Sequence, residues 1–372
     1  MREIRLSPSA MQTHKACPMR YLYSYVYGLT IDQDKDALRM GTNWQRCHEI
    51  LGMTPGEQCP DCLRREEIIE ECSLCGGTGY LPDDVMDAVV RTINDAYETV
   101  PESKTAEQWE TERVILLYSI SGYRWHYGQD SLFDVIASEV YYNLPLIGPG
   151  NRAMTKARVT GKIDHLVRMK DSGLIYVLER KSTSKSVNNE SYWSRLILDD
   201  QITSYLYAAR LLQLMGKLEE YGIAKDDPQI HGIYYDVWSK PGIKPKKITK
   251  ADVAKLEKEG TYCGEQFDVP DNGFETPEMY GARLLTDIAE RPEFYFEQRE
   301  IPRTGDQLAN YEQTLSKMVQ LIRYVETKDL WYRNDLACES PFRCEFRSLC
   351  YNNVDVKPDE IPEGFCSRWE KR

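Results

Sequence analysis

Several features of a membrane or repeat protein are missing from this sequence of 372 residues. No apolar run approaches the roughly 20 residues of a transmembrane helix, which excludes a helical membrane protein. No low-complexity tract or internal repeat is present, so neither a disordered linker nor a solenoid is indicated. No apolar signal region follows Met1, so we expect a reducing compartment, namely the cytoplasm of a bacterium or of a phage-infected host cell.

The sequence also lacks an excess of positive charge, with 47 Lys and Arg against 59 Asp and Glu and a net charge of −12. This balance argues against a general affinity for nucleic acid, but binding depends on the charge local to a groove. One segment, 240–250, is locally basic and also carries Pro and Gly. It reads either as a solvated loop or as a DNA-binding loop whose contacts come from Lys240, Lys244, Lys246 and Lys247.

Two neighbouring strands with charged ends are the most informative part of what is present. Residues 155–169 and 174–181 each read as a strand, and an Asp-Ser-Gly turn signal between them predicts a hairpin. Side chains two apart in a strand face the same side, so Glu179 and Lys181 share a face. If the register brings Asp164 alongside, two carboxylates and one ammonium converge.

This set of side chains suits the hydrolysis of phosphodiesters. Mg²⁺ or Mn²⁺ binds carboxylate oxygens together with water and substrate phosphate. The bound metal generates hydroxide near neutral pH and stabilises the charge on the phosphate, and a neighbouring lysine can orient the attacking water. An ordinary surface hairpin with solvated charges is the alternative, and residues elsewhere in the chain bear on the choice.

Further polar residues precede and follow the hairpin in a fixed order. A predicted helix after Met40-Gly41 carries His48, and a helix predicted over 199–215 presents Gln201 and Tyr205 on one face. The order helical His, G-x-x-D, E-x-K and Q-x-x-x-Y resembles the RecB-like branch of the PD-(D/E)XK nucleases. That branch includes the RecB and AddB nuclease domains, CRISPR-associated RecB-like exonucleases and phage proteins.

The resemblance implies a role for each residue of this ordered set. The residues that would bind the catalytic Mg²⁺ or Mn²⁺ are His48, Asp164, Glu179 and Arg180, the last through its backbone carbonyl. Lys181 would position the water or stabilise the transition state, and Gln201 and Tyr205 would orient the substrate or the lysine. The stretch from the helical His to the G-x-x-D motif exceeds that of a minimal member, and an insertion accounts for part of it.

Eleven cysteines are present, and clustered cysteines in a reducing compartment indicate metal. An extracellular disulfide scaffold is the alternative from the count alone. Two C-x-x-C knuckles separated by nine residues supply four thiolates for a tetrahedral, structural zinc site. The ligands lie in an insertion at 56–80 and are Cys59, Cys62, Cys72 and Cys75. The second knuckle resembles the C-x-x-C-x-G-x-G repeat of DnaJ-type zinc modules.

A second group of cysteines comes from the two ends of the sequence. Cluster-bearing members of the RecB-like branch place one cysteine before the His motif and three after the Q-x-x-x-Y helix. The matching residues here are Cys17, Cys338, Cys344 and Cys350. The resemblance implies a [4Fe–4S] cluster that joins segments 1–30 and 330–372. Zinc on the same ligands is the alternative, and Cys366 could compete as a ligand.

The remaining elements alternate between strands and helices. Strands are predicted at 134–144, 230–238 and 293–301, and helices at 84–99, 199–215, 276–289 and 304–327. A further helix begins after Ser7, its cap, with Pro8 in the first turn. With the hairpin, this pattern predicts an α/β fold with a mixed sheet flanked by helices. The resemblance makes it one restriction-endonuclease-like domain over 1–372.

Together these residues predict a metal-dependent DNA nuclease. The resemblance favours an exonuclease acting on single strands or duplex ends in recombination, repair or phage DNA processing, alongside a helicase or recombination partner. A non-catalytic DNA-binding or assembly subunit is the second hypothesis, since the chain is acidic and carries an inserted knuckle. RNA as the substrate is the third.

Overall fold

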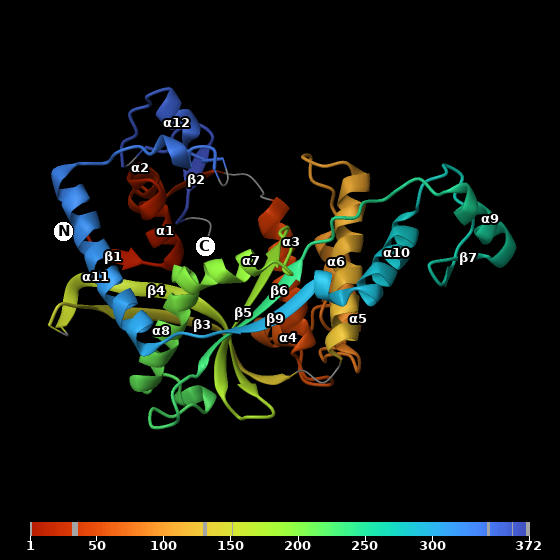
Figure 1. Cartoon of the computed structure of the whole chain (residues 1–372), viewed down its shortest axis with the longest axis horizontal. Coiled ribbons are helices and arrows are strands. Elements are labelled where there is room, and N and C mark those ends of the chain that lie inside the picture. Colours follow the sequence, from red (N-terminus) through yellow and green to blue (C-terminus); the bar gives the residue numbers. More distant parts are fainter. Residues whose placement is uncertain are drawn as a thin grey trace.

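A mixed six-stranded sheet forms the centre of the protein (Figure 1). The computed structural model describes residues 2–31, 36–128, 132–150, 152–340, 343–358 and 360–369. The strand order is β1-β4-β5-β6-β9, and β3 pairs with β4. The strand bounds are Ile4–Leu6 for β1, Phe133–Gly148 for β3, Arg152–Met169 for β4, Ile175–Thr183 for β5, Gly232–Ser239 for β6 and Phe296–Ile301 for β9.

The predicted hairpin is confirmed, because β4 and β5 pair antiparallel. The predicted strands at 134–144, 230–238 and 293–301 correspond to β3, β6 and β9. The sheet is mixed because β5 pairs with β6 in parallel, whereas β6 pairs with β9 antiparallel.

Strand β4 changes its neighbour partway along its length. Residues 157–159 of β4 pair in parallel with β1, and the last of these pairs is Leu6 with Val159. Residues 165–168 of β4 pair antiparallel with β5, and the first of these pairs is His165 with Leu178. Between these two ladders β4 is paired on its other edge with β3. The exchange of neighbours therefore leaves one edge of β4 without a strand partner over residues 160–164, next to Glu179 of β5.

One layer of helices covers the sheet face that carries Val177 and Tyr235. A buried apolar cluster joins these strand residues to α1 (Pro8–Ala16), α8 (Asp200–Leu214) and α11 (Gly305–Lys328). The predicted helix start is confirmed, since the Ser7 Oγ accepts the Ala10 N–H at 3.1 Å. The helix ends at Cys17, which is extended at φ −161°, before Pro18.

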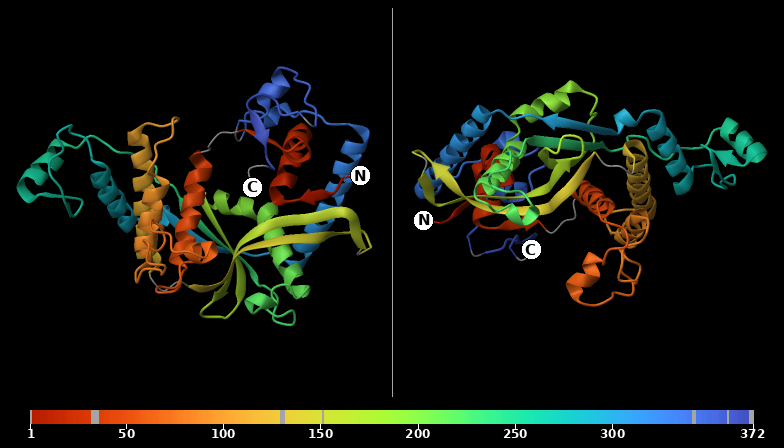
Figure 2. Two further views of the ribbon diagram at one scale, coloured as in Figure 1. Left: turned by 180° about the vertical axis from the view of Figure 1, so that it is seen from behind. Right: turned by 90° about the horizontal axis from the view of Figure 1, so that it is seen from below.

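A second layer covers the opposite face, around Trp238 and Phe296 (Figure 2). Its helices are α3 (Asp36–Leu51), α5 (Val85–Ala96), α6 (Ala106–Tyr127) and α10 (Pro277–Glu290). The sequence prediction did not include α6. Thr105 and Gln108 form a reciprocal capping box at its start. Its buried residues are interleaved with charged ones, so it shows little of the one-sided apolar pattern on which the prediction relied.

The shorter elements complete the chain. They are α2 (Pro18–Tyr21), β2 (Leu29–Ile31), α4 (Pro60–Arg65), α7 (Glu190–Ser194), α9 (Lys250–Glu259), β7 (Thr261–Tyr262), β8 (Glu265–Gln266), α12 (Arg347–Tyr351) and β10 (Phe365–Ser367). A π-helical turn spans Leu22–Val26, and single 3₁₀ turns span Arg195–Leu198, Glu219–Tyr221, Pro292–Phe294 and Asp335–Ala337. Helix α9 and the β7–β8 pair extend away from the sheet (Figure 1). Within the described residues, no helix combines the length and apolar character that crossing a bilayer requires.

The two ends of the described chain lie together. Strands β2 and β10 pair antiparallel, with Phe365 opposite Ile31. Beside this pair, Phe346 packs on Tyr23 at a ring-centroid distance of 5.4 Å. The amino- and carboxy-terminal segments thus form one substructure next to α1 and β1 (Figure 1). A central mixed sheet between two helical layers fits the restriction-endonuclease-like fold.

Candidate active site

Three of the predicted residues converge where β5 ends. The β4–β5 ladder begins at the His165–Leu178 pair, so Asp164 and Glu179 occupy the next position beyond it. The Asp164 side chain is buried and that of Glu179 is fully buried. The Lys181 ammonium forms an ion pair with the Glu179 Oε1. Alternation along β5 places Glu179 and Lys181 on the Val177 face, as predicted.

Burial strongly affects the charge of this group. Burial raises the pKa of Glu179, the Lys181 ammonium lowers it and the nearby Asp164 raises it, and together these effects bring the pKa to about 8. For Lys181, burial lowers the pKa, but the carboxylates of Glu179 and Asp164 outweigh it and leave the pKa raised. Among the described residues, neither oxygen of Glu179 has a partner with hydrogen-bond geometry, despite the ion pair. Buried carboxylate oxygens without donors are suitable ligands for a divalent cation.

Helix α8 brings Gln201 and Tyr205 to the same face. Its start is fixed by Asp199, whose Oδ1 accepts the N–H groups of Gln201 at 2.8 Å and Ile202 at 3.1 Å. The Gln201 Nε2 donates to the Tyr205 Oη at 2.7 Å. Burial raises the pKa of Tyr205, and the Glu179 carboxylate adds to the shift. The predicted Q-x-x-x-Y pair therefore lies against the carboxylates as one hydrogen-bonded unit.

A second tyrosine near the carboxylates was missed by the sequence analysis. Tyr142 of β3 lies within hydrogen-bond distance of the Ser204 hydroxyl at 3.2 Å, and burial, with a contribution from Glu179, raises its pKa to about 12. A Cβ on Gly161 would lie 2.3 Å from the Tyr142 Oη. A side chain at position 161 would collide with Tyr142, so the G-x-x-D motif needs glycine there. This glycine is the sequence signal that could have revealed a large side chain beside it.

The side chain of Arg180 points to the other face of the sheet. Its Nε donates to the Asp236 Oδ2 at 3.3 Å, and the Tyr123 hydroxyl donates to the same oxygen at 2.6 Å. The Gln298 Nε2 in turn donates to the Tyr123 Oη at 2.8 Å. Burial raises the pKa of Asp236, although Arg180 and Tyr123 oppose this effect. A buried polar network therefore lies directly behind the strand that carries Glu179 and Lys181.

His48 belongs to this rear face, so the structure does not bring it to the carboxylates. Its ring packs edge-on against Trp44 at 4.8 Å and Tyr123 at 4.4 Å. Burial lowers its pKa, and Arg180 lowers it further. The rotation of α3 is set by Trp44, which stacks on Trp238 at 4.2 Å. The predicted role of His48 as a metal ligand does not fit this position.

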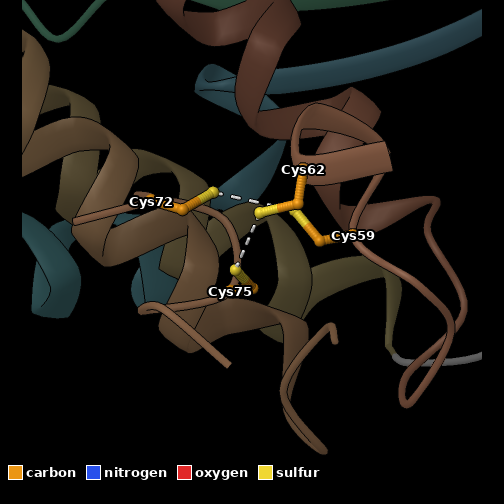
Figure 3. A group of neighbouring side chains, drawn as sticks. All are labelled: Cys59, Cys62, Cys72 and Cys75. Atoms are coloured by element: carbon orange, nitrogen blue, oxygen red, sulfur yellow. Dashed lines mark hydrogen bonds between the residues drawn. The ribbon is translucent and has the colours of Figure 1, made fainter. Parts of the chain in front are cut away.

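The four knuckle cysteines form a compact, buried group (Figure 3). Their sulfur atoms all lie within 4.8 Å of one another. The Cys59–Cys72 separation is 3.7 Å and the Cys62–Cys75 separation is 3.6 Å. Four thiolates around one zinc ion, with Zn–S bonds of about 2.3 Å, have S···S separations of about 3.8 Å. Two C-x-x-C motifs in the described chain thus form a group that fits a single metal ion.

The terminal cysteines surround a larger space. Cys17, Cys338, Cys344 and Cys350 line a cavity of ≈ 220 Å³ together with Arg20, Arg333 and Arg347. All four are described, and they do not meet the spacing found in the knuckle. Cys366 is not part of this lining, because it lies on β10 and its thiol donates to the Thr30 carbonyl at 3.5 Å. The ligand set expected at the two ends therefore gathers around one cavity, beside cations that suit thiolates.

The basic segment after β6 begins near the carboxylates and then leaves them. The Lys240 N–H donates to the Thr183 carbonyl at the end of β5, at 2.7 Å. Further along, the Lys244 carbonyl accepts from Arg283, and the Lys246 N–H donates to Glu275. Lys247 pairs with Phe274 in an isolated bridge. The Lys240 backbone thus meets the end of β5 while its ammonium interacts with Glu112 of α6, and the other lysines lead toward α9.

Comparison with protein families agrees with the fold. The family model of the PD-(D/E)XK nuclease superfamily matches residues 5–351. The chain belongs to the PD-(D/E)XK nuclease superfamily. The match spans β1 to α12 and so includes the carboxylates, α8 and both cysteine groups. A search of curated proteins gave no match. Membership in the PD-(D/E)XK superfamily supports a metal-dependent nuclease.

Proposed function

We propose that this protein is a DNA exonuclease of the RecB-like, iron–sulfur-containing branch of the PD-(D/E)XK nucleases. The observation that carries the proposal is the buried Asp164–Glu179 pair with Lys181 ion-paired to it. A buried acid pair is costly for a fold to maintain and has a clear use in holding a divalent cation. The Gln201–Tyr205 unit beside it supports the same assignment.

In the proposed site each residue has a distinct task. Asp164, Glu179 and the Arg180 carbonyl hold Mg²⁺ or Mn²⁺, which supplies a more acidic water and stabilises charge on the phosphate. Lys181 orients the attacking water and stabilises charge in the transition state. Tyr205, fixed by Gln201, directs its hydroxyl toward the carboxylates and positions the scissile phosphate. His48 is omitted from the ligand set because it packs on the rear face.

The cysteine groups are proposed to hold two different cofactors. The knuckle at 56–80 takes one zinc ion, which suits its sulfur separations. The terminal group takes a [4Fe–4S] cluster, because its four cysteines line one cavity and their order along the chain resembles that of cluster-bearing members. Both are structural, since each joins segments that are separate in the sequence. The cluster would tie 1–30 to 330–372 within a single nuclease domain.

We further propose that the protein acts in the cytoplasm in DNA recombination, repair or phage DNA processing, with a helicase or recombination partner. The segment with Lys240, Lys244, Lys246 and Lys247 would contact the phosphate backbone as DNA leaves the site. Support for this contact comes from Lys240, which lies beside the end of β5.

The decisive experiment is the digestion of end-labelled single- and double-stranded DNA with Mg²⁺ or Mn²⁺. Asp164→Asn and Lys181→Ala should each reduce the cleavage rate by about 10²-fold or more. Lys217→Ala, at an exposed lysine beyond α8, is the matched control and should cut like the parent. Circular dichroism must show that all variants are folded. Equal cutting by Lys181→Ala and the parent would refute the proposed site.

A non-catalytic DNA-binding subunit is the competing function, and the net charge of −12 is the observation that favours it over a nuclease with broad DNA affinity. DNA binding without metal-dependent cleavage of any substrate would support it. An RNA strand of the same sequence, included in the digestion series, tests the remaining alternative of an RNA-directed nuclease.

A further inference from the structure

A large groove lies beside the unpaired edge of β4. Its volume is ≈ 1060 Å³, and its walls come from β1, the strand pair β3–β4 and the carboxy-terminal segment. We call it the amino-terminal groove and define it by the cations and rings that line it. These residues are Arg2, Arg5, Tyr25, Tyr141, Lys162 and Arg368.

The groove leads to the candidate active site. It is lined by Gly161 and Lys162, which lie just before Asp164. Here β4 pairs with β3 on one edge and has no strand partner on the other. It is also lined by Tyr142, whose hydroxyl contacts Ser204 on α8. The groove adjoins the carboxylates at Lys162, because the Asp164 carboxylate is near enough to help raise the pKa of the Lys162 ammonium.

The charge of the groove is opposite to that of the whole protein. Four cationic side chains and one acid, Glu3, line it, whereas the net charge of the chain is −12. Arg2, Arg5 and Lys162 form ion pairs with Glu326, Glu3 and Glu139. These pairs are partly or largely solvated and contribute little energy, so phosphate groups can replace the carboxylates. The groove therefore offers a row of cations to an anionic polymer.

Aromatic rings alternate with these cations. Tyr141, on the edge strand β3, is 72% exposed. The Lys162 ammonium lies 5.7 Å from its ring centroid, and the Arg368 guanidinium lies 4.4 Å from that of Tyr25. A ring next to a cation suits a nucleotide, because the base stacks while the phosphate pairs with the charge.

We propose that the amino-terminal groove binds single-stranded DNA and feeds it to the carboxylates, with Tyr141 stacking on an unpaired base and Lys162 contacting a phosphate. This inference rests on the proposed nuclease function, because it names the strand that the site receives. In a duplex the base faces are already stacked on one another, so an exposed ring contributes to binding only when the bases are unpaired.

Binding of fluorescein-labelled oligo-dT, measured by fluorescence anisotropy in EDTA, tests the groove without cleavage. Tyr141→Ala should weaken binding by roughly 5- to 150-fold, the range for loss of one stacked base. Tyr141→Phe should bind like the parent, and Tyr141→Leu should not, which separates stacking from simple apolar contact. Tyr80→Ala on the knuckle is the matched control, since Tyr80 is also exposed, at 53%.

The salt dependence of the same measurement tests the cation. Lys162→Gln should reduce the slope of log affinity against log salt by about 0.7, the value for one phosphate contact with a single strand. A fully paired duplex should compete weakly. Parental binding by Tyr141→Ala, or tighter binding of the duplex, would overturn the proposal.

Different results refute the groove proposal and the nuclease proposal. If the parent binds oligo-dT through Tyr141 but cleaves no substrate, the proposed groove is supported and the nuclease function is refuted. If the parent cleaves DNA but Tyr141→Ala binds and cuts single strands as well as the parent does, the nuclease function is supported and the proposed groove is refuted.

Discussion

Arg180 and Asp236 form a buried ion pair, with Nε 3.3 Å from Oδ2, immediately behind the proposed metal ligands. Their side chains are 7% and 3% exposed. Arg180 occupies the middle of the E-x-K motif, so its side chain lies on the face of β5 opposite Glu179 and Lys181. The ion pair therefore holds β5 in place from the face that does not carry the candidate site. Tyr123 and Gln298 extend this support to α6 and β9. The geometry of the candidate site thus depends on residues that never contact a substrate there.

We expect Asp236→Ala to destabilise the protein by about 3–5 kcal/mol, because it leaves the Arg180 charge buried without a partner. The double variant Arg180→Met, Asp236→Leu should recover most of this loss. Urea denaturation provides the measurement. Asp134→Ala, which removes the exposed ion pair with Lys170, is the control and should change stability by less than about 0.5 kcal/mol. Equal stability of the single and double variants would show that the pair is not coupled.

The raised pKa of Glu179 makes stability depend on pH. Between its ordinary pKa of 4.5 and its folded value of about 8, the folded state binds more protons than the unfolded state. Stability of the metal-free protein should therefore fall as pH rises through this window. At pH 8 in EDTA, Glu179→Gln should be more stable than the parent, by roughly 1–4 kcal/mol. Thermal unfolding at pH 5 and pH 8 measures the difference, and a less stable Gln variant at pH 8 would contradict the prediction.

The position of His48 predicts that it does not bind the catalytic metal. His48→Gln should leave the Mn²⁺ affinity, measured by isothermal titration calorimetry, within about two-fold of the parent. Asp164→Asn should lower the same affinity by about ten-fold or more, because it removes a charged ligand. A loss in His48→Gln as large as that in Asp164→Asn would instead place the imidazole on the metal and require α3 to rotate.

The knuckle is expected to hold one metal ion that stabilises the fold. Cys72→Ser should remove about one equivalent of zinc, measured by elemental analysis, and should lower the unfolding temperature. Cys263→Ser is the control, since Cys263 lies outside both cysteine groups and should retain the full metal content. Unchanged metal content in Cys72→Ser would show that the knuckle carries no ion.

The terminal cysteines are expected to give the protein a brown colour when it is purified without oxygen. Cys17→Ser should lose the visible absorption and some stability, because the ligands join the two ends of the chain. Cys366→Ser should keep the absorption, since Cys366 does not line the cavity. Zinc alone at both cysteine groups after anaerobic purification would refute the cluster.

Local pattern was sufficient for the hairpin and for the Gln201–Tyr205 pair, because strand and helix periodicity fix which neighbours share a face. It was insufficient for His48, whose direction depends on Trp44 meeting Trp238 from a distant strand. The Arg180–Asp236 pair spans 56 positions and depends on the parallel register of β5 and β6. Contacts that arise only when separate strands and helices assemble left no periodic mark in the sequence.

The cysteine-lined cavity also has a consequence for protein synthesis. One of its sulfurs comes from Cys17, whereas another comes from Cys350. A nascent chain contains the carboxylates and α8 long before the ribosome has added the last of these cysteines. Maturation of the terminal substructure is therefore a late, post-translational event, and a chain cut short after α11 would carry every proposed catalytic residue yet could never close its own ends.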